Sequence, residues 1–303
     1  MEYRFCAESV HDGERIDHFL CEQFEDRSRS FLQHLIEEHQ VLINDLPCKS
    51  NKKISAGDQI TVKLEKAAEP EIVAEDIPLT ILYEDPDVIV VDKPKGMVVH
   101  PAPGHYSGTL VNALLYHCKD LSGINGILRP GIVHRIDRYT TGSVIACKND
   151  LAHNGIAKQL KEHTINRHYL CLVHGEFDAD EGTVDAPIGR SEKDRKKMAV
   201  NRKNGKEAIT HYSVVKRFHG FTLLDCKLET GRTHQIRVHM ASIHHPVVGD
   251  PVYCSLKPPC KLEGQALHAY LLGFTHPRTG EYIEIRSELP AYFTELLSRL
   301  KPF

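Results

Sequence analysis

Residues 131–142 read Gly-Ile-Val-His-Arg-Ile-Asp-Arg-Tyr-Thr-Thr-Gly. An apolar start followed by alternating charges, two threonines and a glycine predicts a strand that ends in a sharp polar loop. Loops held by rigid strands often carry active-site groups, yet an aspartate in such a loop is more often a turn former or a capping residue. Asp137 is therefore a candidate whose role depends on the rest of the chain.

Strand-like runs surround this segment and outnumber the helical patterns. The strand-like runs lie at 81–94 (broken by a turn), 143–147, 169–175, 209–215, 221–228, 267–276 and 282–287, and the helical patterns lie at 109–117, 151–163, 233–244 and 291–300. Strands and helices do not alternate regularly, as they would in a doubly wound parallel fold. We therefore expect an α+β catalytic domain around a mostly antiparallel, mixed sheet.

The N-terminal part has a different pattern. Between Gly13 and Leu64, two runs with helical spacing of apolar residues are followed by short strands, and Ser28 stands where it can cap the second helix. Residues 66–78 are acidic, hold two prolines and lack periodicity, which is typical of a linker. The sequence predicts a small α/β domain at 13–65, a linker at 66–78 and a large domain at 79–303.

Composition narrows the class of protein. The chain has 303 residues and a formal net charge of −3, but residues 79–303 carry 29 Lys and Arg against 24 Asp and Glu, so the large domain is basic. The nine cysteines are scattered and form no C-x-x-C pair, which indicates reduced thiols. Neither a leader nor a long apolar segment is evident in the sequence. We therefore expect a cytoplasmic protein without a membrane span. No histidine spacing indicates a metal site, and the phosphate-loop, dinucleotide and G-x-S-x-G signatures are absent.

The run HRIDRYTTG at 134–142 resembles the H-R-L-D-x-x-T-S-G signature of the RluA/RluD class of pseudouridine synthases, with Ile for Leu and Thr for Ser. Three further blocks, at 92–114, 167–175 and 228–254, resemble that family in the same order. Residues 13–65 are similar to the small RNA-binding domain of ribosomal protein S-four. The resemblance implies the pseudouridine synthase fold and an isomerase that converts uridines of RNA to pseudouridine.

The resemblance also implies roles for individual residues. Asp137 matches the family's essential aspartate, and Arg237 matches the basic residue that holds this carboxylate charged and oriented. Tyr169 matches the active-site tyrosine suited to removing the C5 proton, and Arg135, next to His134, matches the arginine that helps to extrude the target nucleotide. Without the motif, Arg237 reads as a solvated position on an amphipathic helix, and Tyr169 reads as a core residue of a strand.

The reaction breaks the C1′–N1 bond of uridine and joins C5 of the same base to C1′, so it requires no metal and no cofactor. Asp137 can attack C1′, add to C6 of uracil or take a proton from C2′, and the sequence leaves these routes open. Phosphate contacts are expected from basic residues of both domains, although the small domain is net acidic and a basic run is often a solvated loop. The expected RNA-binding residues are His134, Arg135, Arg195, Lys196, Lys197, Arg27, Arg29, Lys52 and Lys53.

Large-subunit ribosomal RNA is the expected partner, with transfer RNA as the alternative, and the protein is expected to act as a monomer. Two other hypotheses use the same residues. The chain would be a non-catalytic assembly protein if it binds RNA and leaves uridine unchanged. It would be a hydrolytic nucleosidase, built on the same carboxylate, if it releases free uracil.

Overall fold

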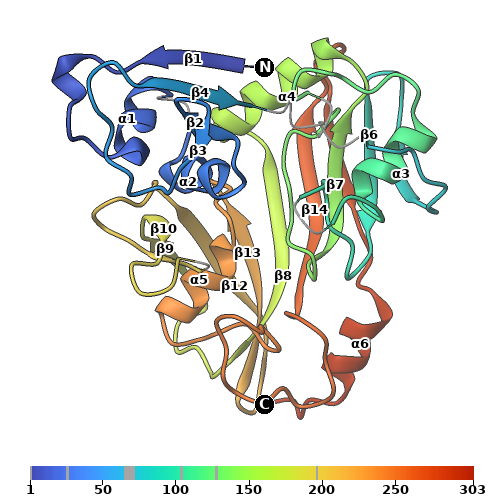
Figure 1. Ribbon diagram of the computed structural model, residues 1–303. Coiled ribbons are helices and arrows are strands. Elements are labelled where there is room, and N and C mark those ends of the chain that lie inside the picture. The colour runs from blue at the N-terminus through green and yellow to red at the C-terminus, as the bar shows by residue number, and fades with distance from the viewer. Residues whose placement is uncertain (1, 25–26, 65–71, 103–104, 127–128, 196) are drawn as a thin grey trace. The chain divides into compact units, whose positions relative to one another are not determined.

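The computed structural model describes residues 2–24, 27–64, 72–102, 105–126, 129–195 and 197–303 (Figure 1). The chain divides into two compact units, Met1–Pro70 and Glu71–Phe303, which are described separately. Within these residues, no helix is long and apolar enough to cross a membrane.

The smaller unit packs two helices against a four-stranded antiparallel sheet of strand order β1-β4-β2-β3. Apolar residues spaced three and four apart on both helices form one buried cluster with the sheet, which is why these segments are helical. The Ser28 hydroxyl accepts a hydrogen bond from the Phe31 amide at 3.3 Å, so the predicted helix cap is present. The elements are β1 (Glu2–Cys6), a 3-10 turn η1 (Ser9–His11), α1 (Ile16–Gln23), α2 (Arg29–Glu37), β2 (Val41–Ile43), β3 (Leu46–Pro47) and β4 (Gln59–Lys63).

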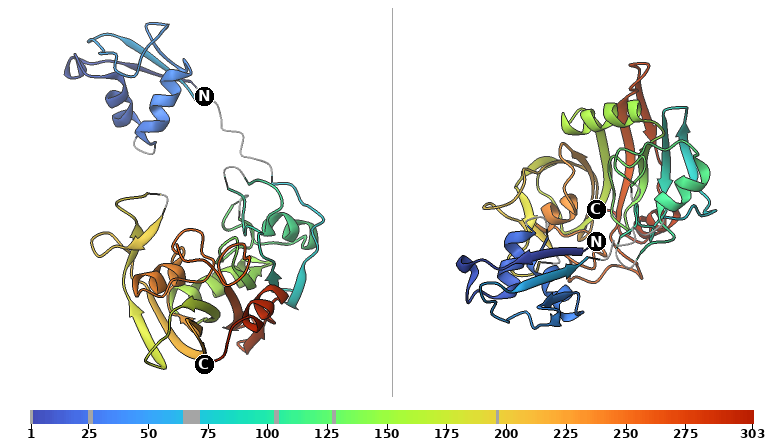
Figure 2. Two further views of the ribbon diagram at one scale, coloured as in Figure 1. Left: turned by 90° about the horizontal axis from the view of Figure 1, so that it is seen from below. Right: turned by 45° about the horizontal axis from the view of Figure 1, so that its top comes forward.

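The larger unit is built on a nine-stranded sheet of order β5-β6-β7-β14-β8-β13-β12-β9, with β15 paired to β14. All pairs are antiparallel except β14 with β7, so the expected α+β domain with a mostly antiparallel, mixed sheet is confirmed. Figure 2 shows this sheet from two further directions. Its strands are β5 (Thr80–Glu84), β6 (Val88–Lys93), β7 (Thr141–Cys147), β8 (Asn166–His174), β9 (Glu181–Asp185), β12 (Ile209–Phe218), β13 (Phe221–Leu228), β14 (Leu267–Thr275) and β15 (Tyr282–Arg286).

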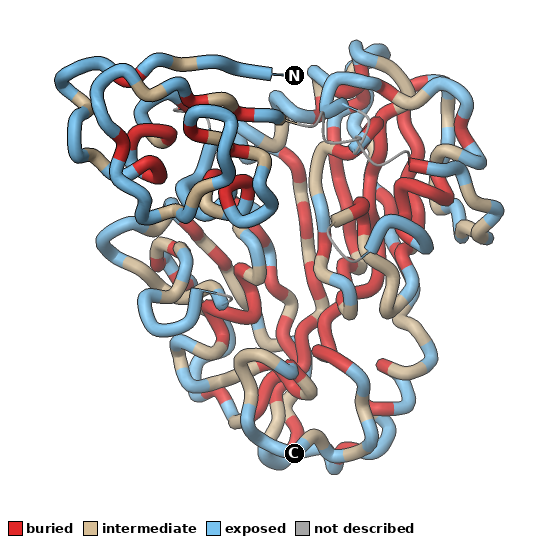
Figure 3. The backbone as a smooth tube through the Cα atoms, viewed as in Figure 1, coloured by how far each residue is buried: buried red, intermediate tan, exposed pale blue. Residues whose placement is uncertain are grey.

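Helices cover both faces of this sheet, because side chains alternate between the two faces along each strand. On one face, residues of β7, β8 and β13 form a cluster with α3 and α5, and on the other face β7 packs on α4 and β8 packs on α6. The central strands are buried almost throughout (Figure 3). The helices are α3 (Leu110–His117), α4 (Asp150–Lys161), α5 (Gln235–Ser242) and α6 (Ala291–Ser298).

Two segments of the larger unit differ in secondary structure from what the sequence predicts. The apolar start of the segment 131–142 was expected to be a strand before the loop, but there Ile132 makes only an isolated bridge to Ala146, and the strand β7 follows the loop. The hairpin of β10 (Ile188–Arg190) and β11 (Met198–Val200) was not expected, and the basic residues Arg195 and Lys197 lie between its two strands. Both elements are short, and short elements give little periodicity in a sequence.

Part of the expected linker belongs to the larger unit. Residues 66–71 lie outside the described residues, whereas Ile72 is buried in the core of the larger unit. The side-chain amide of Asn112 in α3 donates to the Val73 carbonyl at 2.8 Å, and the Glu75 amide donates to the Asn112 carbonyl. These contacts attach residues 72–75 to α3.

Candidate active site

Asp137 lies in the loop that leads into β7. The loop is anchored at its start, where the Cys147 amide donates to the Gly131 carbonyl at 2.8 Å. Gly131 has a positive φ of 69°, and a Cβ there would lie 2.6 Å from the Cys147 carbonyl oxygen, so only glycine fits. Nearer to Asp137, the Thr140 amide donates to its carbonyl oxygen at 3.0 Å, which closes a tight turn. The backbone that carries the candidate carboxylate is therefore fixed.

A buried lysine fastens this loop to the end of β6. Lys93 Nζ donates to the carbonyls of Pro94 and Met97 at 2.9 Å and of Arg138 at 3.1 Å. Burial lowers the pKa of Lys93 to about 7, with a nearby Asp137 acting in the opposite direction. Three carbonyl acceptors favour the ammonium form, because a neutral amine has only two N–H groups. Lys93 thus adds a positive charge behind the loop and uses its protons to hold the backbone.

Asp137 is paired with an arginine that a second aspartate holds in place. Arg237 of α5 donates from Nη1 to Asp137 Oδ2 at 2.8 Å, and it donates from Nε and Nη2 to Asp250 at 2.6 and 2.9 Å. Asp250 is fully buried and also accepts from the amides of Val252 and Tyr253. The two carboxylates raise the pKa of the guanidinium against the effect of burial, and Arg237 lowers the pKa of Asp250 in the same way. The alternative reading of Arg237 as a solvated residue is wrong, because its side chain is 5 % exposed.

The start of α5 is held in an unusual conformation. His234, at the N-cap, has a φ of 59°, in the left-handed region. The next residue, Gln235, is buried and uses its amide group fully: Oε1 accepts from Thr230 and Arg232, and Nε2 donates to Ile209 and Thr210. These bonds to the start of β12 and to the loop before α5 fix the orientation of the helix, and hence the position of Arg237 two residues further on.

His234 and Tyr253 lie between the carboxylate of Asp137 and the hairpin of β10 and β11. The Nε2 atom of His234 lies 3.9 Å from Asp137 Oδ1, and its Nδ1 lies 2.8 Å from the Tyr253 hydroxyl. That hydroxyl also accepts from the Met198 amide at 3.0 Å, at the start of β11. Since the hydroxyl accepts from Met198, its own proton is available for His234 Nδ1. Burial lowers the pKa of His234, which favours the neutral ring that such a bond requires.

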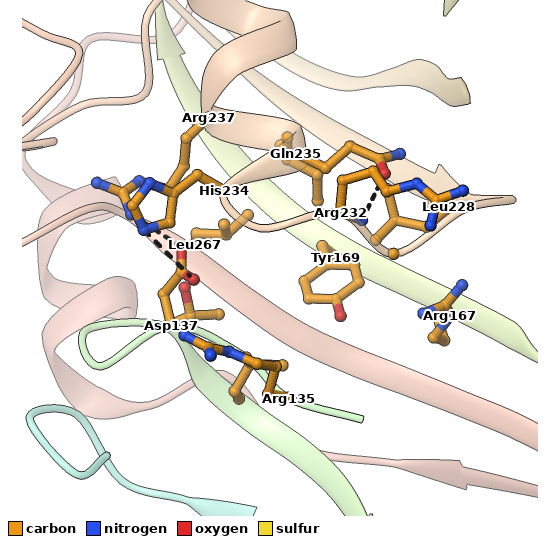
Figure 4. A pocket seen from close by; sticks show the side chains of 14 residues that line it. Arg135, Asp137, Arg167, Tyr169, Leu228, Arg232, His234, Gln235, Arg237 and Leu267 are labelled. Carbon is orange, nitrogen blue, oxygen red and sulfur yellow. Dashed lines mark hydrogen bonds and ion pairs between the residues drawn. The ribbon is translucent and has the colours of Figure 1, made fainter. Parts of the chain in front are cut away.

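Asp137, Arg237 and Tyr169 line one narrow pocket (Figure 4). Its volume is about 50 Å³, and a second hollow of about 300 Å³ also reaches Asp137. Tyr169 stands on β8 and is 7 % exposed, and burial raises the pKa of its hydroxyl. The side chain of Asp137 is 17 % exposed, and no described residue donates a hydrogen bond to its Oδ1. The three residues predicted to be catalytic are thus together, with one carboxylate oxygen left for a substrate.

The expected RNA-binding residues next to Asp137 fall in two environments. Arg135 is exposed and lines the pocket. His134 lies on another side of the loop: its Nε2 accepts from the Ile145 amide at 3.1 Å, so the ring helps to hold the loop on β7. Burial lowers the pKa of His134 to about 3, which keeps the ring neutral.

The remaining expected RNA-binding residues belong to the hairpin of β10 and β11 and to the smaller unit. Arg195 and Lys197 are exposed between β10 and β11, while Lys196 lies outside the described residues. In the smaller unit, Arg27, Lys52 and Lys53 are exposed, but Arg29 donates two hydrogen bonds to the buried Asp17. The charge of Arg29 is therefore already paired.

Several residues of the site were not singled out from the sequence. Asp250, Tyr253, His234 and Gln235 all support the Asp137–Arg237 pair, and all lie within the block 228–254 that resembles the family. Asp250 follows a glycine and precedes a proline, which by itself reads as a turn. Its partner could not be identified from local spacing.

Potential metal ligands gather elsewhere. Asp85, Asp87 and His276 are the most buried of three such groups in the described part of the chain, and Asp137 belongs to none of them. Arg278 already donates to Asp87 from Nε at 2.7 Å, so this group is an ion-pair cluster.

The mixed sheet thus holds a carboxylate, an arginine and a tyrosine in one pocket, and the comparisons with known proteins identify the class of enzyme to which this arrangement belongs. Residues 87–242 match the family model described as RNA pseudouridylate synthase. The chain therefore belongs to this family: it is an RNA pseudouridine synthase, an isomerase that converts uridine to pseudouridine.

Relatives match nearly the whole chain. An uncharacterized RNA pseudouridine synthase of Bacillus subtilis, YlyB, is 52 % identical over 97 % of both chains. The ribosomal large subunit pseudouridine synthase D of Neisseria meningitidis is 44 % identical over 95 % of this chain and 79 % of its own. Among solved structures, human RNA pseudouridylate synthase domain containing 1 matches with a TM-score of 0.60 and 25 % identity, covering 76 % of this chain and 91 % of its own.

Proposed function

We propose that the chain modifies uridines of large-subunit ribosomal RNA. The observation that carries this proposal is the similarity along almost the full chain to relatives named ribosomal large subunit pseudouridine synthase D, including the enzyme of Pseudomonas aeruginosa at 42 % identity. The compartment proposed for the enzyme is the cytoplasm, where bacteria make ribosomal RNA, and the proposed active form is a monomer.

Asp137 is the proposed catalytic carboxylate. Arg237 neutralises one of its oxygens at 2.8 Å, and the other oxygen accepts no hydrogen bond from the described residues. A carboxylate held in this way is ionised and oriented, and it keeps a lone pair for the ribose or the uracil ring. Arg237 is the proposed positioning residue, because two hydrogen bonds to Asp250 fix the orientation of its guanidinium.

Tyr169 is the proposed base for the final proton transfer. The reaction breaks the C1′–N1 bond, forms the C1′–C5 bond and then moves the proton from C5 while N1 gains one, so atoms and charge balance within the substrate. A tyrosine hydroxyl in the same pocket as Asp137 is suited to receive or relay that proton. Leu228, Ile236 and Leu267 line the same pocket with apolar surface, which supports the exclusion of water from the opened sugar.

Arg135 is proposed to occupy the space that the extruded nucleotide leaves in the RNA. Its side chain is exposed at the mouth of the pocket and forms no ion pair with a described carboxylate, so its charge is available to RNA. His134 is proposed to act on RNA through the position of this loop.

Phosphate binding by residues that do not line the pocket is proposed for two further surfaces. On the hairpin β10–β11, the proposed residues are Arg195, Lys196 and Lys197. The smaller unit is proposed to bind RNA through Arg27, Arg29, Lys52 and Lys53, with Arg29 contributing less because Asp17 already pairs with it.

The test is chemical mapping of pseudouridine in ribosomal and transfer RNA from a strain that lacks the gene. We expect one or more pseudouridines of large-subunit RNA to be lost, to return with the wild-type gene, and to stay absent with Asp137→Asn. Asp178→Asn is the matched control, because Asp178 is exposed and lies outside the pocket, and it should restore the modification. Loss confined to transfer RNA, or unchanged maps of both RNAs, would contradict the proposed substrate.

A further inference from the structure

A larger hollow adjoins the pocket of Asp137 and is lined by cations. Its volume is about 710 Å³, and it shares Arg135, Arg167, Gly231 and Arg232 with the catalytic pocket. Among its described lining residues there is no aspartate and no glutamate. The positively charged side chains that line it are Arg129, Arg135, Lys161, Arg167 and Arg232.

Arg167 is the most telling of these side chains, because it is buried without a counter-charge. The residue stands on β8, two positions before Tyr169, and is 6 % exposed. Its Nη2 donates to the Glu229 carbonyl at 3.1 Å, whereas its Nε has no hydrogen-bond partner among the described residues. Burying a guanidinium without a carboxylate is unfavourable, because the lost hydration is not replaced by an opposite charge. An anion from outside would supply that charge.

The other four cations are also free of ion pairs to carboxylates within the described residues. Arg232 donates from Nε to the Glu207 carbonyl, which leaves its charge uncompensated. Cations gathered around a concave surface raise the local concentration of anions, because their fields add where water is partly excluded.

Burial and the neighbouring positive charges lower the pKa of two histidines that line the hollow. The pKa of His100 is lowered to about 4 by burial and then by Arg129 and Arg135. The pKa of His134 is lowered to about 3 by burial and then by Arg167. Both rings are therefore neutral, so neither adds to the positive charge of the hollow.

Gly231 keeps the guanidinium of Arg167 accessible. A Cβ at this position would lie 2.6 Å from Arg167 Nη1. The φ of Gly231 is not in the left-handed region, so its backbone conformation does not itself require glycine. A methyl group at this position would therefore displace the guanidinium of Arg167.

We propose that this hollow, the phosphate cavity, binds the phosphodiester groups next to the target uridine. The proposal rests on the proposed function, because the ribose on which Asp137 would act carries a phosphodiester on each side. A nucleotide in the catalytic pocket places one of these phosphates at the shared wall of Arg135, Arg167 and Arg232. Guanidinium groups suit this ligand, since their planar N–H pairs match two phosphate oxygens.

The test compares two lysines of one helix. Lys161 and Lys158 are both exposed on α4, but only Lys161 lines the phosphate cavity. With an unmodified large-subunit RNA transcript, Kd is measured over a range of salt concentrations. Lys161→Gln should lower the slope of log Kd against log salt by about 0.7–0.9 for the lost phosphate contact, and Lys158→Gln should match the wild type.

Arg167→Gln and Gly231→Ala complete the series. Arg167→Gln should weaken binding about tenfold, as expected for a buried charged contact, and Gly231→Ala should weaken it in the same direction because the new methyl group displaces the guanidinium. Gly231→Ala and Lys161→Gln keep the test decisive if Arg167→Gln does not fold. Should all three variants bind with the Kd and slope of Lys158→Gln, the phosphate cavity is disproved.

Pseudouridine formed in the same transcript separates this proposal from the proposed function. Wild-type protein that forms no pseudouridine but shows the expected loss of slope in Lys161→Gln would contradict the proposed substrate and support the cavity. Normal pseudouridine formation with equal slopes in all variants would support the substrate and overturn the cavity.

Discussion

Asp17 of the smaller unit and Asp137 of the larger unit both accept hydrogen bonds from arginine. They differ in whether a carboxylate oxygen remains without a hydrogen-bond donor. Asp17 in α1 is fully buried and accepts from Arg15, Arg29 and Gln33, so both of its oxygens are occupied. Asp137 accepts from Arg237 through one oxygen and is 17 % exposed at the edge of a pocket. Both carboxylates are held by guanidinium groups, but only Asp137 offers a free oxygen to a ligand.

The two sites differ in the ratio of arginines to carboxylates. Around Asp17, two arginines converge on one carboxylate, which stabilises the ionised form and lowers its pKa, with burial opposing them. Around Arg237, two carboxylates share one arginine, and the fully buried Asp250 accepts two of the three hydrogen bonds that the arginine donates to them. Asp17, whose two oxygens both accept hydrogen bonds, stabilises the fold. Asp137, which one donor orients, keeps an oxygen that can react.

The same substitution at both sites separates these two roles most sharply. We expect Asp137→Asn to lower kcat by about 10⁴-fold or more, since the amide lacks a nucleophilic or basic oxygen. The melting temperature should change little, because the amide oxygen still accepts from Arg237. Single-turnover formation of pseudouridine in the RNA transcript measures the rate. A loss below about tenfold would remove Asp137 from the chemistry.

Asp250→Asn tests whether the buried aspartate directs Arg237. The amide can accept only one of the two N–H groups that Asp250 now accepts, so Arg237 should shift from Asp137 and kcat should fall about 10²-fold, or roughly 3 kcal/mol in the barrier. Asp225→Asn is the control, since Asp225 accepts from His168 and Tyr270 outside the pocket, and its kcat should stay near that of the wild type. Equal rates for both variants would contradict the positioning role of Asp250.

Asp17→Asn should affect stability and leave the chemistry intact. We expect the smaller unit to lose about 2–3 kcal/mol of unfolding free energy, less than a fully buried pair would lose. The reason is that Arg15 and Arg29 are 43 % and 49 % exposed and regain water. Urea unfolding monitored by circular dichroism measures the change. An unchanged midpoint would show that the cluster around Asp17 contributes nothing to the fold.

The pH dependence supplies a check on that result. Because the pKa of Asp17 is lower in the folded state than its ordinary value of 3.8, its contribution is present above that value and is lost as the pH falls through the folded pKa. The difference in stability between the wild type and Asp17→Asn should therefore be constant near neutral pH and shrink below pH 3.8. A difference that grows in acid would have the wrong sign.

Tyr253→Phe should have the smallest effect. The substitution removes the hydroxyl between His234 and the Met198 amide, which should raise the barrier by about 1 kcal/mol and lower kcat/KM several-fold. Tyr212→Phe is a control of the same chemical type, because Tyr212 lies on β12 outside the pocket. If both variants keep the wild-type kcat/KM, the link between the hairpin and Asp137 has no kinetic role.

Much of this arrangement was predictable from the sequence. Long strands such as β8 and β14 and the helices α3 and α4 follow from apolar patterns that extend over seven or more residues. Asp137, Arg237 and Tyr169 were found through motif resemblance, and the structure brings all three into one pocket. The strands β9 and β10 were missed, since five and three residues give too short a pattern.

Features that depend on distant partners were not predictable. Nothing in the local sequence of Asp250 indicates that it binds Arg237, and nothing around Arg167 indicates burial without a carboxylate. The left-handed conformation of His234 also cannot be predicted from the sequence, because non-glycine residues adopt that region only uncommonly. Single residues gain these properties from tertiary contacts that no periodic pattern records.

The parallel pair of the large sheet, β7 with β14, determines which part of the chain must be present before the catalytic loop is held in place. It joins Thr141 to His268, which are 127 positions apart in the chain. Contacts of such long separation form late, and proteins are synthesised from the N-terminus. A nascent chain that has already exposed Asp137 still lacks β14, the neighbour that fixes the strand behind the carboxylate. The catalytic loop therefore cannot reach its final position until β14 has been synthesised.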